Sequence, residues 1–316
     1  FIAISFKLTL ICDIFRYYSF FKGQLVIKKK LLEYRADLLL LSVAIAWGVT
    51  FLMVQDAIKN VPVFSFLFYR FLIATILIAF VCYKKFKHID KSTVFAGVFL
   101  GILLFSGFST QTFALEHTKS SIVAFITGLN VIFVPFISFL LFRDYVRRMV
   151  FVGSFIAVIG LYLLTMSGTL SLGYGESLTI VCALMFALHI LFTDKYSKSK
   201  DVFLLVFFQF LTVTVLSMFF SLGMEDITFD VPMDATFIKA VVVTSIFATF
   251  YAFLIQTYMQ QYTTPTKTAI IFTMEPVSAA LYSYVAINEI LAPIQLMGAV
   301  LIVCATLMAE VKFKKE

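Results

Sequence analysis

Long apolar runs follow one another along the chain from residue 38 to residue 310, and polar residues gather between them. Each run has roughly 18 to 25 residues, the length that an α-helix needs to cross a bilayer. The pattern therefore predicts ten membrane-spanning helices joined by short loops, so that consecutive helices are antiparallel neighbours. The predicted helices cover residues 38–57, 63–83, 93–115, 121–143, 148–166, 174–194, 202–222, 236–260, 265–286 and 291–310.

The two halves of the chain repeat one plan. Residues 111–163 align without a gap with residues 256–308 at an offset of 145, and residues 63–75 align with residues 202–214 at an offset of 139. We divide the chain into an N-terminal extension, a first repeat and a second repeat, which cover residues 1–36, 37–168 and 169–316. Each repeat has five predicted helices, which is an odd number. The first helix of the second repeat must therefore enter the membrane from the side opposite to that of the first helix of the first repeat. The pattern thus predicts an inverted repeat about a pseudo-twofold axis in the membrane plane.

Composition supports an all-α polytopic membrane protein. Hydrophobic residues make up 61% of the chain and charged residues only 14%, which is too little charge for a soluble domain. The net charge of +7 comes from loop residues, so we expect no nucleic-acid partner. The four cysteines have no metal or redox spacing, and we expect no metal, disulfide or cofactor: Cys12, Cys82, Cys182 and Cys304.

Basic residues predict the orientation. With the N-terminus in the cytoplasm, 21 basic residues lie on the cytoplasmic side and only Lys59, Lys119 and Lys239 lie outside. The positive-inside rule therefore predicts a cytoplasmic-membrane protein with both termini in the cytoplasm. Residues 1–36 are too interrupted by charge for a good span, and two interpretations stay open. They form either an upstream extension outside the repeat or a basic amphipathic segment on the cytoplasmic membrane surface.

Polar residues inside the predicted helices are the candidate site, because such groups are costly in lipid. Glu275 lies near the middle of the ninth predicted helix and is followed by Pro276, which removes a backbone donor. Its counterpart in the first repeat is Asn130, with Pro135 a little over one turn further on. These side chains are expected either to contact substrate or act as a gate, or to hydrogen-bond helices together.

Three further residues complete the candidate site. Arg70, whose counterpart is Gln209, is expected to bind an anionic group, to pair with Glu275 or to snorkel outward. His189 is either a hydrogen-bonded structural residue or a proton relay. Trp47 lies mid-span, which favours a cavity wall or a tight helix contact. Separately, Gly153 and its counterpart Gly298 are expected to serve close helix packing.

Several segments carry a resemblance to a known family: Ala46-Trp47-Gly48, Phe68-Tyr69-Arg70-Phe71, Thr118 to Pro135, Met274-Glu275-Pro276 and Asn288-Glu289 through Gly298. Together they are similar to the drug/metabolite transporter superfamily, specifically its ten-helix EamA branch. The resemblance covers roughly residues 38–310, departs at Asp144, where the family often has Glu, and excludes the residues before 36. It implies two five-helix bundles, a central cavity and export of amino acids or other small metabolites.

The leading hypothesis is a permease, an exporter that works by alternating access as a monomer or homodimer, with a small-molecule substrate and protons as a candidate coupling ion. A lipid or polyprenyl-carrier flippase of the same fold is the alternative. An intramembrane enzyme is disfavoured because no nucleophile, base or metal motif occurs at the required spacing. A channel is disfavoured because inverted halves with unlike polar residues suit alternating access better.

Overall fold

The computed structural model describes the chain except residues 1, 119, 144–147, 166–172, 226–233, 288–291 and 311–316, and it describes no side chains before residue 30. The described residues form helices, turns and short loops, with no strand among them. This is the expected solution in lipid, because a helix satisfies its own backbone hydrogen bonds. The Asp144–Glu289 repeat pair lies outside the described residues.

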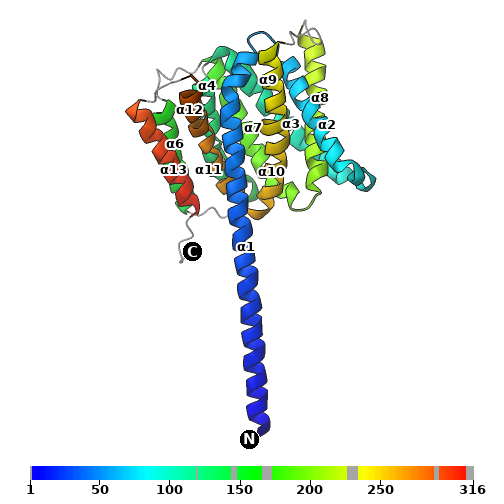
Figure 1. The fold of residues 1–316 in the computed structure, drawn as a ribbon, viewed down its shortest axis with the longest axis vertical. Coiled ribbons are helices and arrows are strands. Elements are labelled where there is room, and N and C mark those ends of the chain that lie inside the picture. The colour runs from blue at the N-terminus through cyan, green and yellow to red at the C-terminus, as the bar shows by residue number, and fades with distance from the viewer. Residues whose placement is uncertain are drawn as a thin grey trace.

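The helices stand side by side in one bundle (Figure 1). The pair α6 and α13 lies at one edge and the pair α2 and α8 at the other, while α1 crosses the bundle and extends beyond it toward the N-terminus. The first-half elements are α1 (Ile2–Ala57), α2 (Val63–Cys82), η1 (Tyr83–His88), α3 (Lys91–His117), α4 (Ser120–Gly128), α5 (Asn130–Ile137), η2 (Ser138–Phe142) and α6 (Arg148–Thr165). The second-half elements are α7 (Tyr174–Ser197), α8 (Val202–Met224), α9 (Ala235–Val243), η3 (Thr244–Tyr251), α10 (Ala252–Met259), η4 (Gln260–Tyr262), α11 (Pro265–Phe272), α12 (Met274–Ile287) and α13 (Pro293–Glu310).

Helical segments occur at all ten predicted positions, but they are not equally long. Within the described part of the chain, seven helices are long and apolar enough to cross a membrane, which makes this a multi-pass membrane protein. Two further apolar helices are shorter, at Arg148–Leu163 and Pro293–Ala305. The ninth predicted segment is divided at Thr273 into α11 and α12.

Side chains at the loop ends define where several helices begin. Asp90, Asp201 and Asp234 accept hydrogen bonds from the first free backbone N–H groups of α3, α8 and α9. Thr264 does the same for α11, with Pro265 as the first helical residue. The hydrogen bonds from Thr93 lower the pKa of the Asp90 carboxyl, so this cap stays charged at neutral pH.

The two helical segments that have a proline in their interior, the fourth and the ninth, both change their hydrogen-bond pattern. The helix of the fourth segment is interrupted at Leu129, between α4 and α5, and continues past Pro135 as the π-helix η2. In the ninth segment the interruption at Thr273 lies three residues before Pro276, whose nitrogen has no hydrogen to donate to the preceding turn. The two interruptions fall at nearly equivalent places in the two repeats, beside Asn130 and Glu275.

Helices α2 and α8 pack along much of their length. Thr75 Oγ1 lies 3.0 Å from Thr214 Oγ1, and the rings of Phe71 and Phe210 have centroids 5.8 Å apart. Both contacts join a residue to its own repeat counterpart. At one end of the pair, the Glu225 carboxylate accepts two backbone N–H groups from the first turn of α2.

Helices α6 and α13 approach through small residues. A Cβ atom added at Gly160 would lie 2.8 Å from the Gly298 carbonyl oxygen, and one added at Gly153 would lie 3.5 Å from the Ala305 carbonyl oxygen. The predicted packing role of Gly153 and Gly298 thus fits an observed helix contact, and Gly160 is its tightest point.

Gly160→Ala is expected to lower the stability of the purified protein by about 1–3 kcal/mol, because the new methyl group meets backbone that cannot yield cheaply. Gly153→Ala on the same helix is the matched control. Its methyl group would make an ordinary contact, so this variant should be as stable as the parent or up to about 1 kcal/mol more stable. Thermal unfolding in detergent measures both, and equal destabilisation by the two variants would contradict the close approach at Gly160.

Candidate functional site

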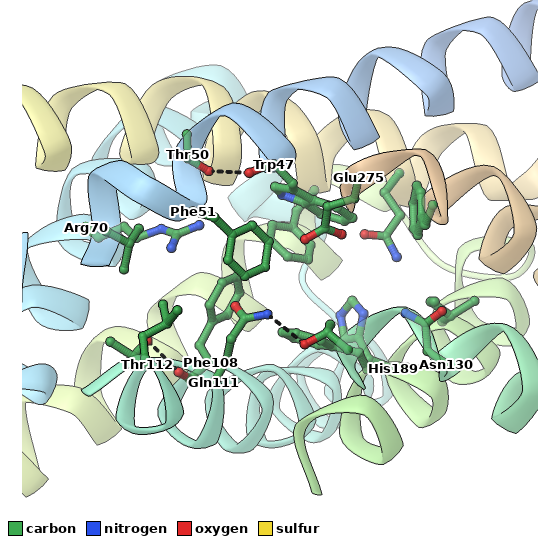
Figure 2. Close-up of a pocket in the computed structure, with 18 residues that line it drawn as sticks. Trp47, Thr50, Phe51, Arg70, Phe108, Gln111, Thr112, Asn130, His189 and Glu275 are labelled. Atoms are coloured by element: carbon green, nitrogen blue, oxygen red, sulfur yellow. Dashed lines mark hydrogen bonds between the residues drawn. The ribbon is translucent and has the colours of Figure 1, made fainter. Parts of the chain in front are cut away.

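A cavity lies inside the bundle between the two halves of the chain. It contains about 650 Å³ of space between side chains, counting its part open to solvent. Its wall is formed by α1, α2, α3, α4, α5, α7, α10, α11 and α12. All five predicted site residues line it: Trp47, Arg70, Asn130, His189 and Glu275. Figure 2 shows these side chains around a common space although they come from both repeats.

Arg70 points into the bundle and is only 4% exposed. Its Nε donates to Thr249 Oγ1 at 2.7 Å and its Nη2 to the Ala248 carbonyl at 3.3 Å. The guanidinium also lies over the Phe108 ring, 4.5 Å from the centroid. The outward snorkelling considered for Arg70 is therefore wrong. Arg70 and Glu275 form no ion pair with each other, and Figure 2 shows them apart in the cavity.

The acceptors for Arg70 come from the π-helix η3. A π-helix shifts the backbone pairing by one residue, which makes a carbonyl available to other donors. The Ala248 carbonyl accepts from Trp47 Nε1 at 2.8 Å as well as from Arg70. The Trp47 ring also packs on Phe253 and Phe272, with centroids 5.3 and 4.9 Å away. Trp47 is thus both a cavity wall and a helix contact.

Thr249→Val is expected to destabilise the protein by about 1–3 kcal/mol, because it leaves a buried guanidinium N–H without its acceptor. Thr257→Val is the matched control, since the buried Thr257 hydroxyl has no hydrogen-bond partner among the described residues. Thermal unfolding in detergent compares the two. A Thr249→Val variant as stable as Thr257→Val would contradict the Arg70–Thr249 hydrogen bond.

Glu275 and Asn130 lie at the two helix interruptions. Glu275 is the second residue of α12 and Asn130 the first residue of α5, so each is next to backbone N–H groups of a first helical turn. The Glu275 carboxylate points into the cavity (Figure 2). Asn130 Oδ1 is buried and has no partner among the described residues. Within that same part of the chain, neither side chain forms the helix-to-helix hydrogen bond that was the alternative interpretation.

His189 is buried and hydrogen-bonded. Its Nε2 donates to Gln209 Oε1 at 2.8 Å, and its ring packs edge-on against Phe253. Gln209 is the repeat counterpart of Arg70, so the two repeats use this position differently. This geometry agrees with the structural interpretation of His189, and a proton relay through it stays a prediction.

Two glutamines of the wall were not among the predicted site residues. Gln111 Nε2 donates to Thr127 Oγ1 at 3.4 Å, and Gln256 Nε2 donates to Gln260 Oε1 at 3.2 Å. Gln256 Oε1 is buried without a partner among the described residues. Gln111 and Gln256 are repeat counterparts, and that pairing was the signal that could have identified them. No group of three or more His, Cys, Asp or Glu residues in the described part of the chain is placed to hold a metal ion.

Comparison with known proteins agrees with this architecture. A transporter from Archaeoglobus fulgidus, named as uncharacterized, is 33% identical over 88% of this chain and 86% of its own length. A second uncharacterized transporter from the same organism is 23% identical over 81% of this chain and 90% of its own. One solved crystal structure has the same fold, with a TM-score of 0.73 at 16% identity, covering 87% of this chain and 96% of that one. The family model described as the EamA-like transporter family matches residues 34–166 and again residues 173–310. The chain therefore belongs to the EamA-like transporter family.

Proposed function

We propose that this protein is a secondary transporter that exports amino acids or other small polar metabolites from the cytoplasm by alternating access. The observation that carries the proposal is that one cavity wall holds both a basic and an acidic side chain. Arg70 supplies a cation and Glu275 a carboxylate, and Phe51 lies between them in Figure 2. A small molecule with both an anionic and a cationic group would complement such a wall, while Phe108 and Trp47 offer apolar contact.

The contacts between the halves support ten crossings arranged as two inverted repeats. Thr75 contacts its own counterpart Thr214, as expected for residues next to a twofold axis. In the other pair, Gly153 meets Ala305, which is the counterpart of Gly160, and Gly160 meets Gly298, the counterpart of Gly153. Such reciprocal contacts are those of an isologous interface. The two helices of each pair are antiparallel. A twofold axis that relates two antiparallel helices is perpendicular to them, so for membrane-spanning helices this axis lies in the membrane plane.

Basic residues support the proposed orientation in the cytoplasmic membrane. The cytoplasmic ends would carry most of the lysines and arginines, including Lys84, Lys85, Lys195 and Lys198. Asp37 and Lys267 then lie at the cytoplasmic end of the bundle, and Glu176 and Glu225 at the outer end.

Transport into liposomes tests the function. Purified protein would be reconstituted, and uptake of a radiolabelled pool of amino acids would be measured with and without an imposed pH gradient. We expect uptake above that of protein-free liposomes for at least one pool member. A dependence on the pH gradient would identify protons as the coupling ion. Arg70→Gln, which installs the residue of the second repeat, should lower the uptake.

The same preparation separates the alternatives. If the pool is not transported, a fluorescent-lipid scrambling assay in the same vesicles tests the flippase hypothesis. Lipid movement without metabolite movement would overturn the proposed function.

A further inference from the structure

Two contacts between the repeats lie at opposite ends of the bundle. At the proposed outer end, Thr118 Oγ1 donates to Glu176 Oε1 at 2.7 Å, and we call this contact the outer latch. At the proposed cytoplasmic end, Thr263 Oγ1 donates to Asp37 Oδ1 at 3.5 Å and Lys267 Nζ to Asp37 Oδ2 at 2.5 Å, and we call this contact the inner latch.

The repeat relates the two latches. Thr118 and Thr263 are counterparts at the offset of 145, and Asp37 and Glu176 are counterparts at the offset of 139. In each latch the carboxylate belongs to the first helix of one repeat. The threonine belongs to the loop before the fourth segment of the other repeat. Each latch therefore joins the two halves of the protein.

The latches lie beyond the two ends of the cavity. Asp37 precedes Trp47 by ten residues on α1, which is about 15 Å of helix. Glu176 precedes His189 by thirteen residues on α7, about 20 Å of helix. Because α1 starts from the cytoplasm and α7 from outside, these distances extend in opposite directions from the cavity.

In the outer latch only one carboxylate oxygen binds the other repeat, whereas in the inner latch both do. Glu176 lies in the first turn of α7, and its Oε2 accepts from the Gly173 backbone N–H at 3.0 Å, so only Oε1 joins the halves. The approach is close, since a Cβ added at Gly175 would lie 3.1 Å from Thr118 Cβ.

The inner latch uses both carboxylate oxygens of Asp37. Helix α1 continues N-terminally past Asp37, so this residue has no helix start to cap. The Asp37 side chain is 9% exposed and that of Lys267 14%, and Asp37 is also bound by Thr263. A charge pair at such low exposure is screened less than one at the surface. The position of Lys267 is occupied by Ile122 in the first repeat, and no cation among the described residues forms an ion pair with Glu176.

We propose that the two latches are the alternating gates of this transporter, and that the Asp37–Lys267 ion pair makes the inner gate the harder to open. This inference rests on the proposed alternating access. One latch must separate for the cavity to reach either side, because each latch connects the two halves at its end. The substrate-free protein then opens preferentially to the outside.

Accessibility of a cysteine in the cavity tests the gates without any substrate. In a variant with all four native cysteines replaced, Thr112→Cys is a nearly isosteric reporter on the cavity wall. A membrane-impermeant, positively charged methanethiosulfonate reagent is applied to right-side-out or inside-out vesicles, and the labelling rate is measured. The parent should be labelled faster from the outside than from the cytoplasmic side.

Each gate is then weakened separately. Thr118→Val removes the outer donor while leaving the Glu176 helix cap, and should raise labelling from outside about ten-fold. Lys267→Gln should raise labelling from the cytoplasmic side by a similar factor and lower it from outside. The exchange Asp37→Lys with Lys267→Asp should restore the parent's labelling, which distinguishes an ion pair from a general loss of folding.

Two local ion pairs within one repeat each provide the controls. Asp56, near the outer end of α1, pairs with Lys59 in the following turn, and Asp194, near the cytoplasmic end of α7, pairs with Lys198 just past that end. Asp56→Asn and Asp194→Asn change the charge at the same ends but should leave labelling unchanged.

Two results would overturn the proposal: the labelling rate does not change in the latch variants, or it changes equally from both sides in both of them. Either result would show that the latches are permanent structural contacts. A side-specific change in a protein that moves no metabolite would instead uphold the gates and reject the proposed substrate class. Gel-filtration profiles of all variants confirm that the folded protein is compared.

Discussion

Glu275→Gln is expected to lower transport by about 10- to 100-fold while the protein still folds. The substitution keeps the size of the side chain and replaces a carboxyl group that can ionise with a neutral amide. A hydrogen bond to a charged group contributes about 1.5–3 kcal/mol, which corresponds to this range of rates. The Glu275 carboxyl group points into the cavity and forms no ion pair with another described residue, so it is available to a substrate or a coupling ion. The liposome assay measures the rate, and gel filtration checks folding.

The repeat counterpart Asn130 provides the control. Asn130→Ala should lower transport less than Glu275→Gln does, because the neutral amide of Asn130 contributes a weaker contact. The double variant Glu275→Asn with Asn130→Glu moves the carboxylate to the other repeat. We expect it to stay impaired, because Arg70 has no cationic equivalent at Gln209 and the two halves of the wall differ. Full activity of Glu275→Gln would remove Glu275 from the site.

The position of the cavity wall could be predicted because lipid makes polar residues rare within helices. Each buried polar group in such a helix is itself a signal, and this logic selected Arg70, Asn130, His189 and Glu275 from segments far apart in the sequence. The repeat then related them to one another. The same logic failed for Gln111 and Gln256, because the predicted helices end at residues 115 and 260 and both glutamines therefore lie near a predicted helix end, where a polar side chain is a weaker signal.

The partners of Arg70 could not be predicted. Its acceptors are a backbone carbonyl at Ala248 and a hydroxyl at Thr249, both presented by the π-helix η3. A carbonyl is the same in every residue, and the extra residue of a π-turn has no reliable sequence signature. Helix hydropathy therefore predicted the segment correctly but not its hydrogen bonds. The division of the ninth segment at Thr273 was similarly hidden, although Pro276 indicated a local disturbance.

Gly48→Ala is expected to have the second large effect, on stability and transport together. A Cβ atom at this position would lie 2.4 Å from the Glu275 carbonyl oxygen, 2.7 Å from Ser278 Cβ and 2.8 Å from the Ala279 nitrogen. Two of these three atoms are backbone, so α1 and α12 would have to separate. We expect a loss of about 1–3 kcal/mol or more in thermal unfolding. Gly223→Ala, whose methyl group would meet nothing within 4 Å, should be neutral or slightly stabilising.

Gly48→Ala should lower the transport rate by more than the loss of folded protein accounts for. The crowded carbonyl belongs to Glu275 itself, so separating α1 from α12 moves the residue that carries the cavity carboxylate. A displacement of about 1 Å at a functional group can reduce a rate by about 100-fold. The rate should therefore stay low at temperatures well below unfolding, where Gly160→Ala, of similar stability loss but far from the cavity, remains active. If Gly48→Ala and Gly160→Ala lose activity in parallel with stability, the contact between Gly48 and α12 serves packing alone.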